Sequence, residues 1–481
     1  MSNKASPLAP LADEVADTLT ALEAANDRFA GLRPGERGDR QPVHVVYGGA
    51  HLFRRDTASR LGALALASLD NYAPDPFAFA RILELPGAES LDCDEARAKA
   101  VYIADPEQLR AEDRSAWLAL TVYDRVRDKL EREPVEDFRL DFEDGYGNRP
   151  DDEEDATAIA AARELAAGLT AGTLPPFCGI RIKPLEGALL RRSIRTLELF
   201  LSTLIEDAGR LPDNFVVTLP KIAVPEQVST LVRLFEALER RLGLDEGALK
   251  LELMIELAHA LFDEHGALVL PQLLRAAEGR CKAAHFGTYD FTASFGVTAA
   301  QQRMDHPGCD FALDLMKAAF AETGVWLSDG ATNVMPVPIH RPVHGAALTA
   351  EQAQANVEAV HKAWRLAHRH NRRSLIRGYY QGWDLHPAQL PVRYAACYGF
   401  FLEGFDAAAK RLRNFVEQAA KATLVGEVFD DAATGQGLLN YFLRALACGA
   451  VSLEELALTG LTQDELRTRS FLAILAGRRG A

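Results

Sequence analysis

The sequence lacks the patterns that mark several large classes of protein. No uncharged apolar run reaches the roughly 18 residues of a membrane-spanning helix, so we expect no membrane partner. The six cysteines are scattered and form no CxxC pair, which is typical of a reducing compartment without a zinc or disulfide framework. The first residues turn polar too early for a signal peptide. Together these absences predict a cytoplasmic protein.

Basic residues are also scarce. The 481 residues include 53 Lys+Arg against 68 Asp+Glu, which gives a formal net charge of −15. Nucleic-acid binding needs many cations to replace phosphate counterions, so we expect no nucleic-acid partner. The first βα turn has no GxGxxG fingerprint, and neither a GxSxG elbow nor an HExxH pair occurs. These gaps argue against a dinucleotide site, a hydrolase triad and a zinc protease.

What the sequence does contain is an alternation of short apolar runs with longer helical stretches. We predict eight strands, at 43–47, 138–142, 179–183, 214–221, 249–256, 282–289, 334–339 and 374–380. We predict helices at 8–30, 55–69, 153–171, 186–208, 225–242, 310–323 and 350–370. Near-continuous apolar runs suit parallel strands that are buried on both faces. The pattern therefore predicts an α/β fold, a (β/α)8 TIM barrel, with an open doubly wound sheet as the alternative.

The spacing of these elements also predicts a domain organisation. Residues 1–42 form an N-terminal helix and linker, and residues 43–395 form the barrel. The gap between the first two strands is too long for one helix, so an insertion is expected at about 70–136. Residues 396–481 turn helical to the end and predict a C-terminal helical appendage.

Charged side chains gather where the predicted strands end. They are Asp141, Glu143 and Asp144 after the second strand, Arg181 and Lys183 on the third, Lys221 after the fourth, Glu256 after the fifth and Asp290 after the sixth. His386 follows the last strand. Catalytic groups of such barrels lie at the carboxyl ends of the strands, so we expect these side chains at one rim. Taken singly, each is equally explained as a helix cap, an ion pair or a solvated charge.

Taken together, the charged residues have a chemical logic. Two carboxylates from neighbouring strands suit a hard divalent cation, Mg²⁺ or alternatively Mn²⁺, which keeps some waters and accepts substrate oxygens. A guanidinium nearby would face an oxygen on which charge develops. This is the equipment for forming or cleaving a carbon–carbon bond beside a carbonyl group through an enolate.

Six short motifs in fixed order then point to a family. They are LDFEDGYG (140–147), IRIKPL (180–185), TLPKI (218–222), MIELAHAL (254–261), AHFGTYDFTASFG (284–296) and DLHPAQLP (384–391). The set resembles the citrate lyase beta-subunit branch of the HpcH/HpaI aldolase family, within the pyruvate/phosphoenolpyruvate barrel superfamily. The resemblance implies a homo-oligomer, a trimer or a hexamer. Its substrate would be a small oxo or hydroxy acid or an acyl-CoA.

The resemblance also implies roles for individual residues. Glu256 and Asp290 match the two metal ligands, and Arg181 matches the substrate-binding arginine. Asp141, Glu143 and Asp144 match the acids that order metal-bound water and this arginine. Lys183, Lys221 and His386 are further candidates for substrate binding, and Asp431 is a candidate for the catalytic base that malate synthases take from a C-terminal segment. The family usually has Asn at the position of Lys183 and Glu at that of Tyr289.

The expected activity is a Mg²⁺-dependent carbon–carbon lyase or aldolase acting on a 2-oxo acid or 3-hydroxyacyl substrate. A malate-synthase-like condensation of acetyl-CoA with a 2-oxo acid uses the same metal site and stays open. A non-catalytic subunit that binds metal and oxo acid is an alternative of another class. Phosphoryl transfer from phosphoenolpyruvate would require a phosphohistidine or nucleotide site, which the sequence does not reveal.

Overall fold

The computed structural model describes residues 11–91, 94–342, 347–418 and 432–479. Its centre is a closed barrel of eight parallel strands in sequence order, which confirms the predicted fold class. The strands are β1 (His44–Gly49), β2 (Asp137–Asp141), β3 (Phe177–Arg181), β4 (Phe215–Leu219), β5 (Lys250–Ile255), β6 (Cys281–Phe286), β7 (Trp326–Ala331) and β8 (Gln381–Trp383). Apolar side chains of the strands face the surrounding helices and form the main core.

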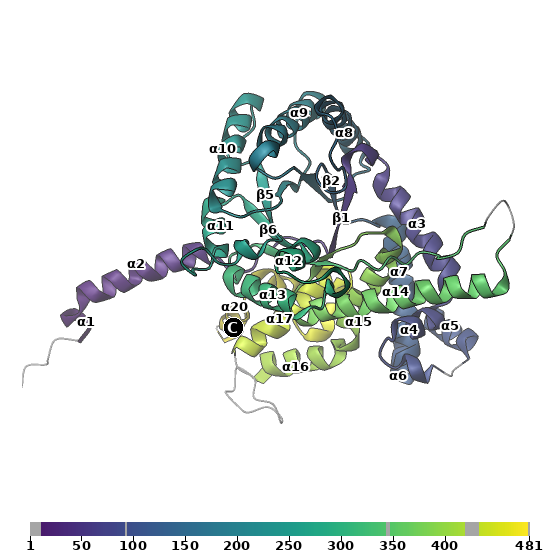
Figure 1. Cartoon of the computed structure of the whole chain (residues 1–481). Coiled ribbons are helices and arrows are strands. Elements are labelled where there is room, and N and C mark those ends of the chain that lie inside the picture. The colour runs from purple at the N-terminus through teal and green to yellow at the C-terminus, as the bar shows by residue number, and fades with distance from the viewer. Residues whose placement is uncertain (1–10, 92–93, 343–346, 419–431, 480–481) are drawn as a thin grey trace, which may run out of the picture.

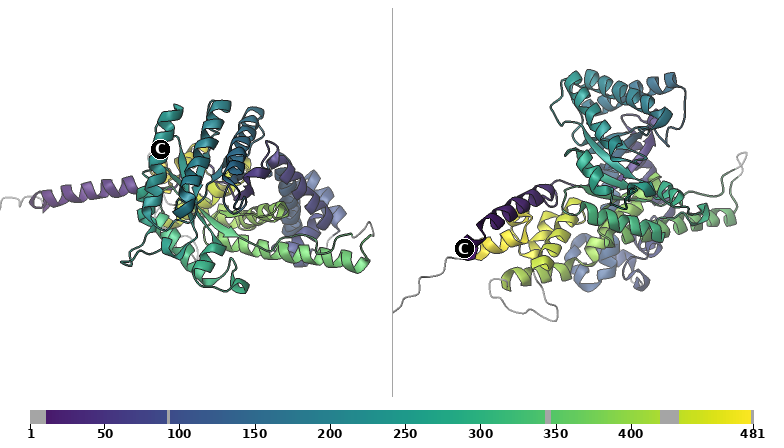
Figure 2. Two further views of the ribbon diagram at one scale, coloured as in Figure 1. Left: turned by 45° about the horizontal axis from the view of Figure 1, so that its top comes forward. Right: turned by 60° about the vertical axis from the view of Figure 1, so that its left-hand side comes forward.

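Helices cover the barrel and extend beyond it (Figure 1). The helices between and after the strands are α3 (Thr57–Tyr72), α8 (Asp151–Ala171), α9 (Leu190–Ala208), α10 (Pro225–Leu242), α11 (Leu270–Ala276), α12 (Thr288–Ser294), α13 (Pro307–Phe320), α14 (Ala350–Ile376) and α15 (Leu390–Glu403). Figure 2 shows α8, α9 and α10 side by side along the outside of the strands. Gly172 in the left-handed conformation ends α8, as its position after the helical pattern predicts.

Two of the predicted strands are wrong. The seventh strand lies at Trp326–Ala331 and not at 334–339, where Pro336 and Pro338 have no N–H to donate to a ladder. The eighth predicted strand, 374–380, is the end of α14 followed by a turn at Gly378, and β8 begins at Gln381. The pattern of apolar residues does not predict β7, because its sequence, WLSDGA, contains polar residues although the strand is fully buried.

The long segment between β1 and β2 is a helical insertion, as predicted. It contains α4 (Pro76–Leu83), α5 (Glu95–Ala104), α6 (Pro106–Glu112) and α7 (Arg114–Arg132), and α7 packs on α3 and α15. The C-terminal appendage comprises α16 (Phe405–Gln418), α17 (Ala432–Ala447), α18 (Leu453–Leu456), α19 (Gln463–Thr468) and α20 (Phe471–Arg479). The boundary proposed at 395 falls inside α15, which packs on both the barrel and the appendage, and the domain division stays a prediction.

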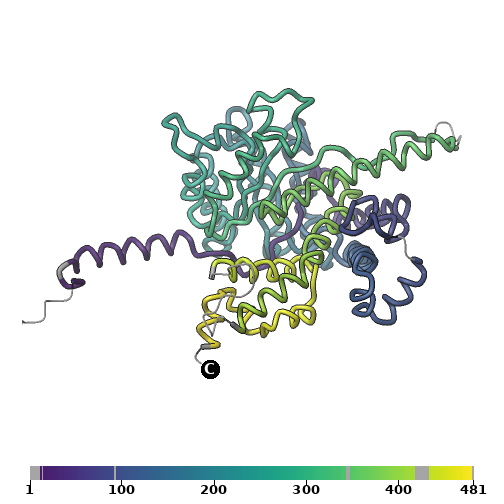
Figure 3. Tube along the Cα trace, turned by 90° about the horizontal axis from the view of Figure 1, so that it is seen from below, coloured from purple at the N-terminus to yellow at the C-terminus, as the bar shows by residue number. Residues whose placement is uncertain are grey.

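The N-terminal helices α1 (Leu11–Glu14) and α2 (Ala16–Leu32) form an arm that extends from the body, and the start of α14 projects on another side (Figure 3). No residue of α2 is buried. Its apolar side chains Leu22, Phe29 and Leu32 are therefore mostly exposed. Contact with a second copy of the chain would cover these exposed apolar side chains. The trimer or hexamer remains a prediction. None of the helices in the described part of the chain is both long and apolar enough to cross a membrane.

The interior of the barrel is polar, whereas barrels of this kind are usually filled with branched apolar side chains. Arg139 donates to both oxygens of Glu252, with N–O distances of 2.8 and 2.6 Å, and also pairs with Asp137. Glu252 lies 3.2 Å from Nε2 of His285, whose Nδ1 lies 3.1 Å from the hydroxyl of Tyr47. This buried network runs along the barrel toward the carboxyl ends of the strands.

The first strand gives the fold a measurable dependence on pH. His44 is completely buried, its Nε2 accepts the backbone N–H of Glu136 at 3.0 Å, and its Nδ1 lies 3.5 Å from Asp384. Burial lowers the pKa of His44 from 6.5 to about 4, although the Asp384 carboxylate opposes the shift. Below pH 6.5 the unfolded chain therefore binds a proton that the folded chain does not.

We expect the free energy of unfolding to fall as the pH drops from 6.5 to 4, with about 3 kcal/mol of the loss due to His44. Urea unfolding at a series of pH values measures this slope. A His44→Gln variant should show a shallower slope across the same window, whereas replacing the exposed His265 by Gln should not. An unchanged slope in His44→Gln would contradict the assignment.

Candidate active site at the carboxyl ends of the strands

Asp141 closes β2 and is held by four hydrogen bonds. It accepts the backbone N–H of Glu143 at 3.0 Å and that of Gly145 at 2.7 Å, so the chain folds back around the carboxylate. A Cβ at position 145 would lie 2.7 Å from an Asp141 oxygen, which explains the glycine in DFEDGYG. The other two bonds come from Arg181, at 2.7 Å from Nε and 2.5 Å from a terminal nitrogen.

Arg181, the last residue of β3, is therefore fixed in position. Its second terminal nitrogen lies 2.9 Å from Glu143, and the side chain is only 2% exposed. The guanidinium carbon lies 4.9 Å from the ring centre of Tyr47 and 5.6 Å from that of Trp383. Aromatic faces and carboxylates thus hold a permanently charged fork at the rim.

Lys221 lies at the centre of the acidic residues. Its ammonium nitrogen is 2.6 Å from Asp290, 3.3 Å from Glu256, 3.4 Å from Glu143 and 4.0 Å from Asp144. Its backbone is left-handed, with φ of 51°, and its N–H donates to Glu256 at 2.7 Å. Four carboxylates from three strand ends therefore converge on one cation. We call Asp141, Glu143, Asp144, Arg181, Lys221, Glu256 and Asp290 the rim cluster.

Glu256 is almost completely buried, at 1% exposure, as is Asp141. It follows β5 directly, and a Cβ at Gly287 would overlap its side chain at 2.6 Å, so the glycine after β6 makes room for it. Burial raises the pKa of Glu256 to about 8, with Lys221 opposing and Glu143 adding to the shift. Burial also raises the pKa of Glu143, against the pull of Arg181 and Lys221.

One side of the rim cluster is open to solvent. The side chain of Asp290, in the first turn of α12, is 42% exposed, and that of Asp144 is 62% exposed. Glu256, Glu143 and Arg181 line the closed side. A ligand can therefore approach the convergent carboxylates and the guanidinium from one direction.

The side chains of the rim cluster include the oxygen donors that a divalent cation needs, but they are not arranged around one. In the described ranges, no group of three or more His, Cys, Asp and Glu side chains is arranged as a ready metal site. The Lys221 ammonium lies between the carboxylates of Glu256 and Asp290, 3.3 Å from the first and 2.6 Å from the second. That ammonium and one oxygen of Glu143 are buried without a well-directed hydrogen bond. Five carboxyl groups face two cationic side chains, and their hard oxygen atoms are of the donor type that Mg²⁺ prefers.

Two of the predicted site residues, Lys183 and His386, make their contacts outside the rim cluster. The Lys183 ammonium donates to the carbonyl oxygens of Phe142 and Gly147 and pairs with Glu154 at 3.0 Å, so these contacts give no support to substrate binding. His386 caps a short helix by accepting the N–H of Ala388 at 3.1 Å, and burial lowers its pKa. Asp431 lies outside the described residues.

The sequence reasoning missed two aromatic residues. The rings of Tyr47 and Trp383 lie 4.4 Å apart, centre to centre, at an interplanar angle of 46°, and flank Arg181 from β1 and β8. Tyr47 ends the run VHVVY, and the two-residue period of a strand would have placed it on the inner face with Val45. No comparable signal exists for Trp383, because β8 has only three residues.

The chain matches a protein-family model. A family model described as Domain of unknown function (DUF6986) matches residues 22–474. No curated protein matches the chain.

Several solved structures are similar in fold. A citrate lyase from Burkholderia xenovorans LB400 is 20% identical, with a TM-score of 0.49 over 70% of this chain and 92% of the other. The protein CitE from Mycobacterium tuberculosis, in complex with magnesium, acetoacetate and coenzyme A, is 15% identical, with a TM-score of 0.42 over 67% and 95%. Haloferax volcanii malate synthase in a lead(II) complex is 14% identical, with a TM-score of 0.41 over 74% and 92%. All three TM-scores lie under 0.5, so these similarities give no evidence on the activity of this chain.

Proposed function

The chain belongs to the family described as Domain of unknown function (DUF6986), and from the geometry of its rim cluster we propose that it is a magnesium-dependent carbon–carbon lyase or aldolase. The substrate class is a 2-oxo acid or a 3-hydroxyacyl compound, including CoA thioesters. One observation carries the proposal: the carboxylates of Glu143, Asp144, Glu256 and Asp290 converge beside the fixed guanidinium of Arg181.

Glu256 and Asp290 are the proposed magnesium ligands, with Glu143 and Asp144 ordering water around the ion. Mg²⁺ prefers one or two protein carboxylates and retains several waters, which matches one buried and one exposed acid on an open rim. When bound, the ion supplies Lewis-acid polarisation of a carbonyl oxygen. Lys221 lies between these acids, is 19% exposed, and is the proposed partner of a substrate carboxylate at the open side.

Arg181 is the proposed stabiliser of developing negative charge. Two of its five N–H groups donate to Asp141, at 2.7 and 2.5 Å, and the other terminal nitrogen lies 2.9 Å from Glu143 as an ion pair. Its orientation is therefore set before a substrate arrives, and the remaining N–H groups are available to a carboxylate or enolate oxygen. Such preorganised donors stabilise charge without reorganising during the reaction.

In the cleavage direction, a base removes the proton of the substrate hydroxyl group and the carbon–carbon bond breaks. The electron pair of that bond moves to the carbonyl fragment, which becomes an enolate facing Arg181. A proton transferred to its carbon completes the second product. Asp431 is the proposed base, because malate synthases take this base from a C-terminal segment and Asp431 lies in that part of the sequence. The condensation of acetyl-CoA with a 2-oxo acid runs through the same kind of enolate and is tested in the same experiment.

The test is a product assay of the full chain with Mg²⁺. One set of reactions contains 4-hydroxy-2-oxo acids or 3-hydroxyacyl-CoA thioesters and is followed by mass spectrometry for the two cleavage products. The other contains acetyl-CoA and glyoxylate and is followed for released CoA. We expect cleavage in the first set, and no cleavage after treatment with EDTA, with activity restored by added Mg²⁺ or Mn²⁺.

Condensation without cleavage would replace the lyase assignment by the synthase. Binding of magnesium and oxo acid by calorimetry without turnover in either set would support the non-catalytic alternative. Cleavage at an unchanged rate in EDTA would contradict the metal requirement.

A further inference from the structure

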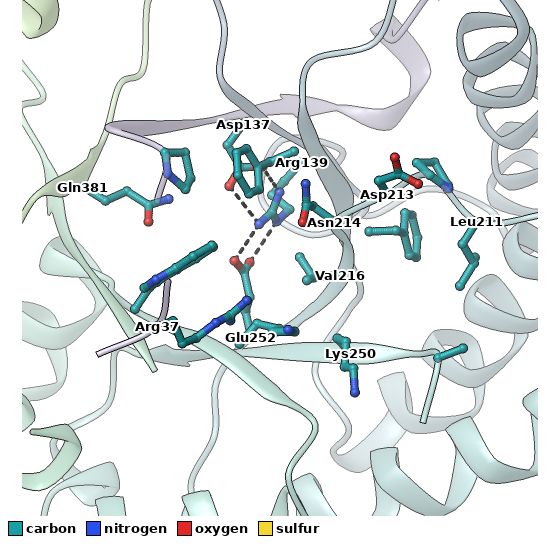
Figure 4. Close-up of a pocket in the computed structure, with 17 residues that line it drawn as sticks. Arg37, Asp137, Arg139, Leu211, Asp213, Asn214, Val216, Lys250, Glu252 and Gln381 are labelled. Atoms are coloured by element: carbon teal, nitrogen blue, oxygen red, sulfur yellow. Dashed lines mark hydrogen bonds and ion pairs between the residues drawn. The ribbon is translucent and has the colours of Figure 1, made fainter. Parts of the chain in front are cut away.

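A cavity lies at the end of the barrel where the strands begin, whereas the rim cluster lies where they end, and Figure 4 shows the residues that line it. Its volume is about 340 Å³, and its walls come from the first residues of the strands and from the linker before β1. We call it the basal pocket, and its walls include Arg37, Phe177, Lys250, Lys282 and Trp326. Along β5, Lys250 and Glu256 are separated by six residue steps, or about 20 Å. The basal pocket is therefore a separate site.

Two cations of the basal pocket have no counter-ion. Arg139 pairs with Asp137 and Glu252, as the dashed lines in Figure 4 show, and Arg37 pairs with Asp39. Within the described part of the chain, by contrast, neither Lys250 nor Lys282 has a hydrogen bond or an ion pair. Both side chains are half-buried. Asp213 also lines the pocket, but no carboxylate of the described residues lies within 4.0 Å of either lysine ammonium, so both can pair with an anion in the cavity.

The pKa values of both lysines reflect this environment. Burial lowers the pKa of Lys250, and the nearby cations Arg280 and Arg37 lower it further, while Glu239 opposes the shift. Burial also lowers the pKa of Lys282, and Arg37 and Lys250 add to the shift, while Asp39 opposes it. An anion in the pocket would relieve this repulsion.

The backbone is arranged so that Lys282 lines the cavity. Leu251 of β5 pairs with Cys281 and Glu252 pairs with Ala283, so Lys282 is an extra residue in β6 without a partner in the register. In a regular strand, residues 282 and 285 would face opposite sides, and His285 faces the barrel interior. Such a bulge re-aims a side chain, and bulges are common beside functional sites.

The remaining wall is aromatic. The rings of Phe177 and Trp326 meet edge to face at 5.9 Å, and the guanidinium of Arg37 lies 4.3 Å from the Trp326 ring centre. Together with Ala283 these two rings form an apolar cluster separate from the main core. The cavity volume is within the range of small-molecule sites, which combine apolar walls with a few polar anchors.

We propose that the basal pocket binds a small organic anion, a carboxylate or phosphate attached to a planar apolar group. Lys250 and Lys282 contact the anionic group, and Phe177 and Trp326 contact the planar part. The proposal is independent of the reaction at the rim cluster.

The test is calorimetric titration of the full chain, with tryptophan fluorescence as a second readout. The probes are benzoate, phenyl phosphate, benzyl alcohol and inorganic phosphate. We expect saturable binding of at least one of the two aromatic anions, and at least tenfold weaker binding of benzyl alcohol and inorganic phosphate. Tighter binding of phenyl phosphate than of benzoate would identify phosphate as the preferred anion, and the reverse would identify carboxylate.

Variants assign the binding to the pocket. A double Lys250→Met, Lys282→Met variant should weaken the aromatic anion at least tenfold while its thermal midpoint stays equal or rises, because repulsion is removed. Lys362→Met, on the exposed surface of α14, is the matched control and should change nothing. Glu256→Gln, in the rim cluster, should also leave this affinity unchanged. Equal affinity in the double variant, or no saturable binding of either aromatic anion, would overturn the proposal.

Discussion

Replacing Glu256 by Gln is expected to weaken the binding of Mg²⁺ roughly 100-fold and to abolish its coupling to oxo-acid binding. The amide keeps the shape of the side chain but removes the negative charge from an almost completely buried position of the rim cluster. Asp290→Asn should have a similar effect from the exposed side, because its carboxylate and that of Glu256 converge on the same point. Calorimetric titration with Mg²⁺ and pyruvate, separately and together, measures both quantities.

Two further variants sharpen this test. Glu264→Gln, in the same β5–β6 connection, has a side chain that is 86% exposed and should leave the affinity unchanged. Lys221→Met should change the affinity in the opposite direction, because it removes the ammonium that competes for the four carboxylates. If Glu256→Gln and Lys221→Met both bind Mg²⁺ as the wild type does, the acids of the rim cluster do not form a metal site.

The sequence predicts those residues of the rim cluster that stand directly at the ends of strands. Asp141, Arg181 and Glu256 stand at the ends of apolar runs, and parallel strands in a barrel bring those ends to one rim. The central position of Lys221 depends on a left-handed backbone two residues after β4 and on contacts with three other loops, which no local pattern encodes.

The missed strand β7 shows a similar limit in the fold. Asp329 is buried in this strand because Ser374 donates to it at 2.6 Å, across 45 residues of sequence, and Gly330 donates its N–H at 2.7 Å. Hydrophobic periodicity cannot identify a strand whose polar residues are paired by distant partners. The basal pocket could not be predicted from the sequence either, because the position of Lys282 in its wall depends on a one-residue bulge in β6.

The second large effect is expected for Arg181→Lys. Lysine keeps the charge but cannot engage both oxygens of Asp141 in a planar fork, so the cation loses the fixed orientation that Asp141 and Glu143 impose. We expect kcat of the cleavage reaction to fall by a factor of about 10² to 10³, the range found when one preorganised donor is lost. Steady-state kinetics at saturating Mg²⁺ measures the change.

Arg139→Lys is the matched control for this variant. Arg139 lies in the same barrel, is equally buried at 2%, and binds Glu252 and Asp137 as Arg181 binds Asp141 and Glu143. Both variants should therefore lose about 2 kcal/mol of unfolding free energy in urea, because each loses charge-assisted hydrogen bonds in the interior. Only Arg181→Lys should lose kcat, since Arg139 opens onto the basal pocket and not onto the rim. Equal losses of kcat in the two variants would mean that Arg181 contributes through stability alone, because the two arginines differ chiefly in which end of the barrel they face.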